Sequence, residues 1–191
     1  MKKIMFDDKY GLTKAVLSKS KTMTRRMIPL TEDDKKYLDT AFDWDLREAV
    51  ILDRYARYKV GDEVAICQSY KELMEKEYLP SKMENEVIRM VEKNSFGCTN
   101  KMYVRAELMP HRIRITERWI EKLQDITDAE CLQEGIIQGY SLEDFPYFTY
   151  PNCKESWGTA REAFASLICK IGKKDTWESN PYVIVYRFES I

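Results

Sequence analysis

Residues 182–188 read Tyr182-Val183-Ile184-Val185-Tyr186-Arg187-Phe188, a nearly continuous apolar run with β-branched residues at its centre. Such a run predicts a strand that is packed on both faces. The preceding segment predicts a helix over 159–171, because it opens with a capping-box signal and ends before Gly172. Within that helix the apolar residues recur at helical spacing: Phe164, Leu167, Ile168 and Ile171.

Further strands and helices are expected toward the middle and the start of the chain. A short run with few polar residues predicts a strand at 63–68, and alternation of apolar and polar residues predicts strands at 102–108 and 112–123. Short helices are expected at 12–18 and at 128–134, the second ended by Gly135. Because helices and strands mix without regular alternation, the sequence predicts an α+β fold around a mainly antiparallel or barrel-like sheet.

Composition indicates one folded domain over residues 1–191. Hydrophobic residues make up 44% and charged residues 33%, which excludes a disordered charged tail. Three stretches read as insertions into the domain: about 27–58 with short helices, 70–100 with a helical hairpin, and 137–158. The 31 Lys and Arg residues nearly cancel the 32 Asp and Glu residues, so a site for a polyanion must be a local cluster of cations.

Metal, cofactor and membrane functions find no support in the sequence. The chain has one His and five scattered Cys without a C-x-x-C pair, so we expect no metal site, no cofactor and no disulfide framework. No apolar run approaches the ~20 residues that span a bilayer, and the N-terminus lacks a signal-peptide core. We therefore expect a cytoplasmic protein that does not contact a membrane; its oligomeric state stays open.

The segment Lys21-Thr22-Met23-Thr24-Arg25-Arg26 places three cations and two hydroxyls within six positions. It could form a solvated edge strand or contribute to a binding site. In a regular strand Lys21 and Thr24 would point to opposite faces, so a joint role requires a bulge or loop near Thr22.

Two other features are candidates for a site. Glu134 lies in the last turn of its predicted helix, where the helix dipole disfavours a carboxylate by roughly 0.3–1 kcal/mol, so a nearby cation should compensate, unless it is a harmless surface residue. Arg112 and Arg114 share one face of a strand and could bind an anion through their guanidinium groups. The alternative for the two arginines is cross-strand pairing with Glu107 or Glu117.

These residues together resemble ASCH domains, members of the PUA-like superfamily of small β-barrels. The segment 21–26 resembles the Lys-Thr-x-Thr-x-Arg signature of that family. Three later segments resemble landmarks of its longer bacterial and phage members: Met109-Pro110 with Arg112 and Arg114, Leu123-Gln124-Asp125-Ile126-Thr127 before Glu134-Gly135-Ile136, and Trp177-Glu178-Ser179-Asn180-Pro181-Tyr182-Val183.

The resemblance implies a twisted barrel of about five or six strands with helices at its rim. It implies a cleft where the turn at Lys21 faces the helix that carries Glu134. ASCH domains are proposed RNA-binding modules, and one compact branch hydrolyses acetylated cytidine with a lysine, a threonine and a glutamate. On the matching motifs these three fall on Lys21, Thr24 and Glu134.

Three functions follow as hypotheses. The first is binding of RNA or of a modified nucleotide or nucleoside in a cationic cleft formed by Lys21, Arg25, Arg26, Arg112 and Arg114. The alternative is an amidohydrolase of an acylated nucleoside, in which Lys21 takes the proton of the attacking Thr24 hydroxyl and Arg26 or backbone amides stabilise the oxyanion. A second alternative is an accessory protein of a phage or mobile element that acts through protein contacts of its insertions.

Overall fold

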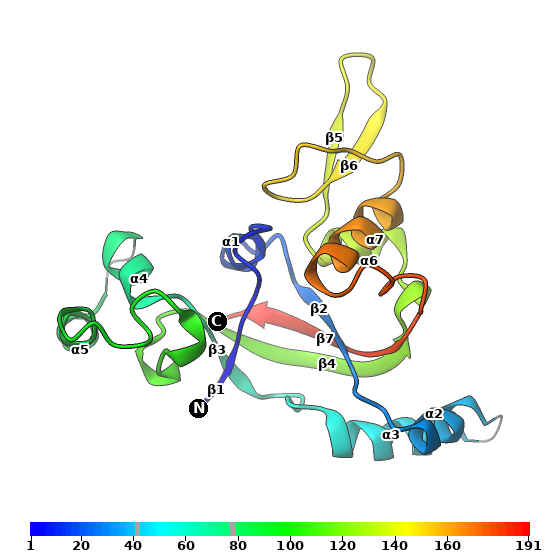
Figure 1. Ribbon diagram of the computed structural model, residues 1–191, viewed down its shortest axis with the longest axis horizontal. Coiled ribbons are helices and arrows are strands. Elements are labelled where there is room, and N and C mark those ends of the chain that lie inside the picture. The colour runs from blue at the N-terminus through cyan, green and yellow to red at the C-terminus, as the bar shows by residue number, and fades with distance from the viewer. Residues whose placement is uncertain (41–42, 77–78) are drawn as a thin grey trace.

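A five-stranded sheet forms the centre of the protein in the computed structural model, which describes residues 1–40, 43–76 and 79–191 (Figure 1). The strands lie in the order β1, β3, β4, β7, β2. Their bounds are β1 (Lys2–Ile4), β2 (Met23–Met27), β3 (Glu63–Ile66), β4 (Arg112–Lys122) and β7 (Tyr182–Ser190). All neighbours are antiparallel except β1 and β3, which are parallel. The mixed α+β class and the mainly antiparallel sheet are as the sequence predicts.

The apolar run at 182–188 is the central strand of this sheet. It forms most of β7, which pairs with β4 on one side and with β2 on the other. The side chains from Tyr182 to Tyr186, which alternate between the two faces of the sheet, are all buried. The prediction of a strand packed on both faces is confirmed.

The expected closed barrel is not found among the residues that the structure describes. β1 and β2 are the two outer strands of the sheet, and no backbone pairing joins them across the described ranges. Side chains occupy the space between these edges instead, and the Arg26 guanidinium donates a hydrogen bond of 2.7 Å to the carbonyl of Met5, the residue after β1. The sheet is therefore open at the seam between its first strand and β2.

Helices cover the sheet and its ends. Their bounds are α1 (Leu12–Leu17), α2 (Glu32–Asp39), α3 (Trp44–Tyr55), α4 (Tyr70–Lys76), α5 (Ser81–Glu92), α6 (Asp128–Gln133) and α7 (Ala160–Ile171), with short 3-10 turns at Lys101–Tyr103, Ala106–Leu108 and Leu123–Asp125. The helices expected at 12–18, 128–134 and 159–171 are observed as α1, α6 and α7. α6 and α7 lie side by side over β2 and β7 (Figure 1). None of the described helices has the length and apolar character needed to cross a bilayer.

The strand expected at 102–108 is wrong, since two 3-10 turns occupy this segment. Val104, Ala106 and Leu108 are buried as the alternation predicts. However, the backbone bonds to side chains and not to a neighbouring strand, because the Lys3 ammonium donates to the Val104 carbonyl and the Arg105 N–H donates to the Tyr70 hydroxyl. Alternation alone did not distinguish this arrangement from a sheet.

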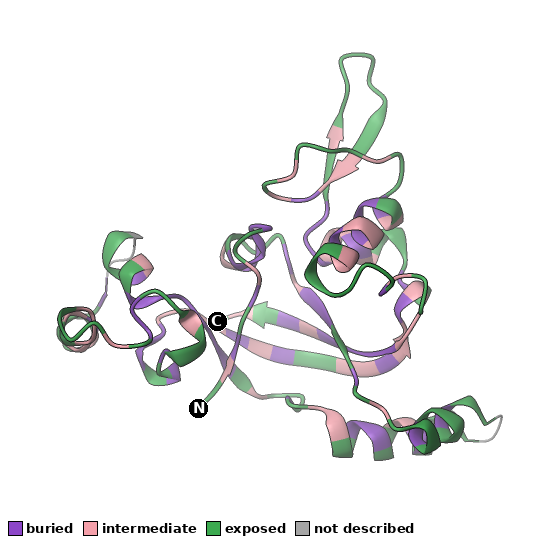
Figure 2. Cartoon of the chain, in the orientation of Figure 1, coloured by how far each residue is buried: buried purple, intermediate pink, exposed green. Residues whose placement is uncertain are grey.

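The three stretches predicted as insertions pack differently, and Leu38, Ile51 and Leu52 of the first belong to the main core. The first carries α2 and α3, and the second carries the expected helical hairpin, α4 and α5, which packs on a small separate core with Leu73, Val87 and Leu108. Positions 41–42 and 77–78 of these insertions lie outside the described residues. The third carries a hairpin of β5 (Ile137–Tyr140) and β6 (Pro146–Thr149) that projects from the body and is largely exposed (Figure 2).

Candidate active site

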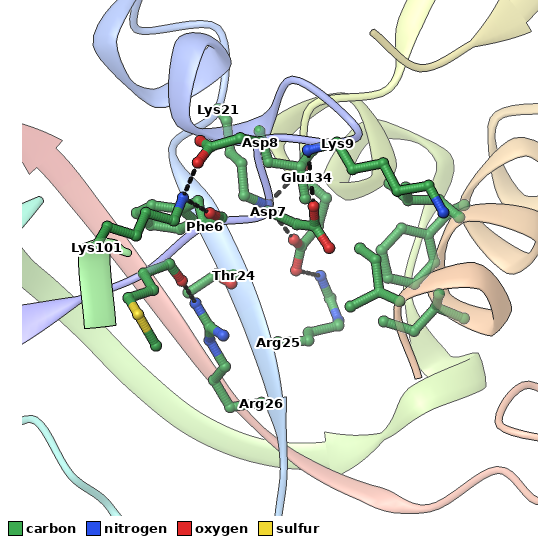
Figure 3. Close-up of a pocket in the computed structure, with 16 residues that line it drawn as sticks. Phe6, Asp7, Asp8, Lys9, Lys21, Thr24, Arg25, Arg26, Lys101 and Glu134 are labelled. Carbon is green, nitrogen blue, oxygen red and sulfur yellow. Dashed lines mark hydrogen bonds and ion pairs between the residues drawn. The ribbon is translucent and has the colours of Figure 1, made fainter. Parts of the chain in front are cut away.

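A cavity of about 460 Å³ lies beside the edge strand β2 (Figure 3). One wall is the loop after β1, from Met5 to Lys9, and the opposite wall is the apolar face of α7. Lys21, Thr24 and Glu134 line this cavity. The structure therefore brings together the three residues that the resemblance to ASCH domains assigns to an amidohydrolase.

Lys21 lies in the turn that precedes β2 and is not part of the strand. Its N–H donates to the Ala15 carbonyl at 3.0 Å, and the next N–H, of Thr22, donates to the Gln133 carbonyl at 2.9 Å. The strand begins only at Met23. Since the strand alternation does not apply before Met23, Lys21 and Thr24 can face one cavity, and the expected loop near Thr22 is confirmed.

Lys21 and Glu134 form a buried ion pair. The ammonium donates to Glu134 Oε2 at 2.5 Å and to the Glu134 carbonyl at 2.7 Å. The two side chains are only 2% and 6% exposed. Burial lowers the pKa of Lys21 below its ordinary value, although the charge and hydrogen bond of Glu134 act in the opposite direction.

Glu134 caps the C-terminal end of α6, the position that the helix dipole disfavours for a carboxylate. Gly135 follows in a left-handed conformation with φ of 100°, which turns the chain back and leaves the carboxylate facing β2. Lys21 and Arg25 compensate its charge from the side of β2. The unfavourable position of Glu134 in the sequence is thus explained by two buried cations.

Arg25 is surrounded by three carboxylates. Its Nε donates to Glu121 at 2.7 Å, and its two terminal nitrogens lie 3.1 Å from Glu130 and 3.3 Å from Glu134. Glu121 also accepts a bond of 2.6 Å from the indole N–H of Trp119. The guanidinium side chain is 1% exposed and its three nitrogens all have protein acceptors, so it holds Glu134 in place and is not available to a ligand.

Thr24 is 5% exposed and lines the cavity. Its hydroxyl makes no hydrogen bond to any residue in the described part of the chain. The hydroxyl oxygen is nevertheless not fully shielded from solvent. A buried threonine whose hydroxyl opens only into a cavity is available to react with a bound molecule.

Three further cations line the cavity: Arg26, which the sequence predicts, and Lys9 and Lys101, which it does not. Arg26 is bonded to the Met5 carbonyl and its guanidinium carbon lies 5.6 Å from the centre of the Phe6 ring. Lys101, which directly follows the second insertion, forms an ion pair of 2.6 Å with Asp8 and also donates to the Phe6 carbonyl. No pattern in the sequence links Lys101 to this loop, because the two segments meet only through the tertiary fold.

Arg112 and Arg114 lie on β4 and do not line the cavity. Arg114 is exposed and pairs with Glu63 at 3.2 Å and Glu189 at 3.3 Å, on the two neighbouring strands. Cross-strand pairing was the alternative given for these arginines, although the partners differ from those expected. The five cations of the first hypothesis do not gather in a single cleft.

Within the described ranges, no group of His, Cys, Asp and Glu side chains is arranged to hold a metal ion. No family model, no curated protein and no solved structure matches this chain.

Proposed function

We propose that this protein hydrolyses the amide bond of a small acylated nucleoside, of which N4-acetylcytidine is the simplest example. The observation that carries this proposal is the meeting of Lys21, Thr24 and Glu134 at one cavity. A volume of about 460 Å³ is within the range of small-molecule sites. The apolar wall from α7 offers contact to a planar base or an acyl group, and the polar wall carries the reactive groups.

The three residues have complementary chemical roles. Thr24 Oγ attacks the acyl carbon and forms a C–O bond, while its proton passes to the Lys21 amine. The tetrahedral intermediate collapses by breaking the C–N bond, and the leaving amine takes the proton back from Lys21. Water then hydrolyses the threonine ester and releases the carboxylic acid.

The environment of Lys21 suits the role of a base. A lysine at its ordinary pKa is protonated near neutral pH, whereas burial lowers the pKa of Lys21 and raises the fraction of neutral amine. Glu134 orients the amine and stabilises the ammonium ion that forms during attack. Arg25 in turn fixes Glu134.

The charges in the cavity favour hydrolysis over binding of a polyanion. Five cations and three carboxylates line the cavity, and Glu121 and Glu130, which pair with Arg25, bring the carboxylates to five, so the cavity carries no excess positive charge. A phosphate backbone is bound mainly through uncompensated Lys and Arg. A neutral nucleoside suits this cavity better than extended RNA.

The resemblance to ASCH domains supports the same proposal, since three of its four signature residues, Lys21, Thr24 and Arg26, line the cavity. We further propose that the sheet is a PUA-like barrel with one open seam, between β1 and β2. The bond from Arg26 to the Met5 carbonyl bridges that seam, and the cavity lies against it.

Turnover of N4-acetylcytidine by purified protein tests the function. We expect release of cytidine by the wild-type chain and its loss in Lys21→Ala, Glu134→Ala and Thr24→Val. Thr24→Val preserves shape and removes a hydroxyl that has no hydrogen-bond partner among the described residues, so the variant should fold normally. Thr22→Val is the matched control, because Thr22 is not among the residues that line the cavity, and it should retain turnover.

A wild-type chain that shows no turnover on a panel of acylated nucleosides would refute the proposal. Retention of full turnover by Thr24→Val would refute the role of threonine as the nucleophile.

A further inference from the structure

The register between β2 and β7 determines which backbone groups of β2 are free. The Phe188 N–H donates to the Thr22 carbonyl at 2.9 Å, and the Ile28 N–H donates to the Tyr182 carbonyl at 3.3 Å. In an antiparallel pair, every second residue exchanges both backbone bonds with its partner. Thr24 and Arg26 therefore bond to β7, and the N–H of Arg25 points away from β7 at the free edge of the sheet.

The cavity follows this free edge. Thr24 and Arg25 are consecutive strand residues, so their side chains leave on opposite faces of the sheet, yet both line the same cavity. A cavity that reaches both faces must pass along the outer edge of β2. The N–H of Arg25 emerges at that edge, and it bonds to no acceptor in the described residues.

We propose that the backbone N–H of Arg25 is the oxyanion donor of this active site. The inference rests on the proposed amidohydrolase function and identifies the group that binds the developing charge. When Thr24 Oγ bonds to the acyl carbon, the π electron pair of the carbonyl moves onto its oxygen. The donor on the residue after the nucleophile lies next to that oxygen when the acyl group sits at the edge of β2.

The surroundings of Arg25 hold this donor still. Its guanidinium is fixed by Glu121, Glu130 and Glu134, and the flanking residues Thr24 and Arg26 are bonded to β7. A donor that needs no rearrangement during the reaction stabilises the transition state most effectively. The same ion pairs that place Glu134 beside Lys21 thus also fix the backbone at residue 25.

An amide-to-ester replacement tests the donor without changing any side chain. Incorporation of the α-hydroxy analogue of arginine at position 25 removes the N–H and weakens the Thr24 carbonyl as an acceptor from Tyr186. The α-hydroxy analogue of methionine at position 27 is the matched control. It removes another outward N–H of β2 and weakens the Arg26 carbonyl, but Met27 does not line this cavity.

We expect the ester at position 25 to lower kcat for N4-acetylcytidine by about 10²–10³-fold with KM changed less than about threefold, since the bond forms in the transition state. The ester at position 27 should change kcat less than about threefold. Equal kcat in the two ester variants would overturn the role of the Arg25 N–H while leaving the function intact. A wild-type chain without turnover would overturn the function and the donor role together.

Discussion

Arg25 and Arg114 both belong to strands of the central sheet and both contact more than one carboxylate, but their surroundings differ. The side chain of Arg25 is 1% exposed and has three carboxylate partners, whereas that of Arg114 is 44% exposed and has two. Water screens the exposed pairs, while the buried cluster relies on its own members for compensation of charge. Two arginines that both lie on strands and both pair with carboxylates therefore differ in function, and the burial of the side chain decides which of them can be part of a site.

The largest effect on stability is expected from loss of Arg25. Arg25→Met preserves much of the side-chain volume but leaves three partly or fully buried carboxylates without their shared cation. We expect the free energy of unfolding to fall by about 3–5 kcal/mol near neutral pH, as is typical when one partner of a buried ion pair is removed. Urea unfolding monitored by circular dichroism measures this change, and a loss below about 1 kcal/mol would contradict the role assigned to the cluster.

A smaller effect, a shift in the pH dependence of turnover, is expected from a change at Glu134 and tests the role of Lys21. The turnover of wild-type protein should rise with pH and level off below the ordinary lysine pKa of about 10.4, because the base that we propose is the neutral Lys21 amine. Glu134 raises the pKa of Lys21 through its charge and hydrogen bond. In Glu134→Gln this influence is lost, so the rising limb of kcat/KM should move to lower pH while the maximal rate falls. The pH profile of the residual activity measures this shift, and a limb that moves to higher pH would exclude Lys21 as the base.

The smallest effect is expected at Arg114. Arg114→Ala removes two exposed ion pairs, which typically contribute between zero and about 1 kcal/mol together. We expect unfolding free energy to change by no more than about 0.5–1 kcal/mol and turnover of N4-acetylcytidine to stay at the wild-type level. A large loss of turnover would show that the arginines of β4 contact the substrate and would restore the hypothesis of a wider cationic cleft.

Much of the fold could be predicted from local patterns. β7, α6 and α7 have strong signals, because a continuous apolar run, capping residues and a terminal glycine act within a few positions of one another. The segment 102–108 has an equally regular pattern and is not a strand. Its hydrogen-bond partners, Lys3 and Tyr70, are distant in sequence, and no local pattern reveals them.

The candidate site likewise has residues that local patterns reveal and residues that only the tertiary fold brings together. The cluster at 21–26 and Glu134 could be found from local patterns, whereas the set of Lys21, Thr24 and Glu134 came from the resemblance to ASCH domains. The role of Arg25 could not be found, since Glu121 reaches it only after β4 and β2 have both paired with β7, and Glu130 only through the tertiary placement of α6. Lys101 was missed for the same reason, because it meets Asp8 across 93 positions of the chain (101 minus 8).

The small core under α4 and α5 has a consequence for motion. Lys101 follows the α4 and α5 hairpin in the chain. Its ammonium bonds to Asp8 and to the Phe6 carbonyl and so restrains the loop that forms one wall of the cavity. If the α4 and α5 unit opens locally, that restraint is lost, so amide hydrogen exchange in the helical hairpin and in the loop from Met5 to Lys9 should respond together. A nucleoside bound in the cavity would then slow exchange in helices that it does not touch.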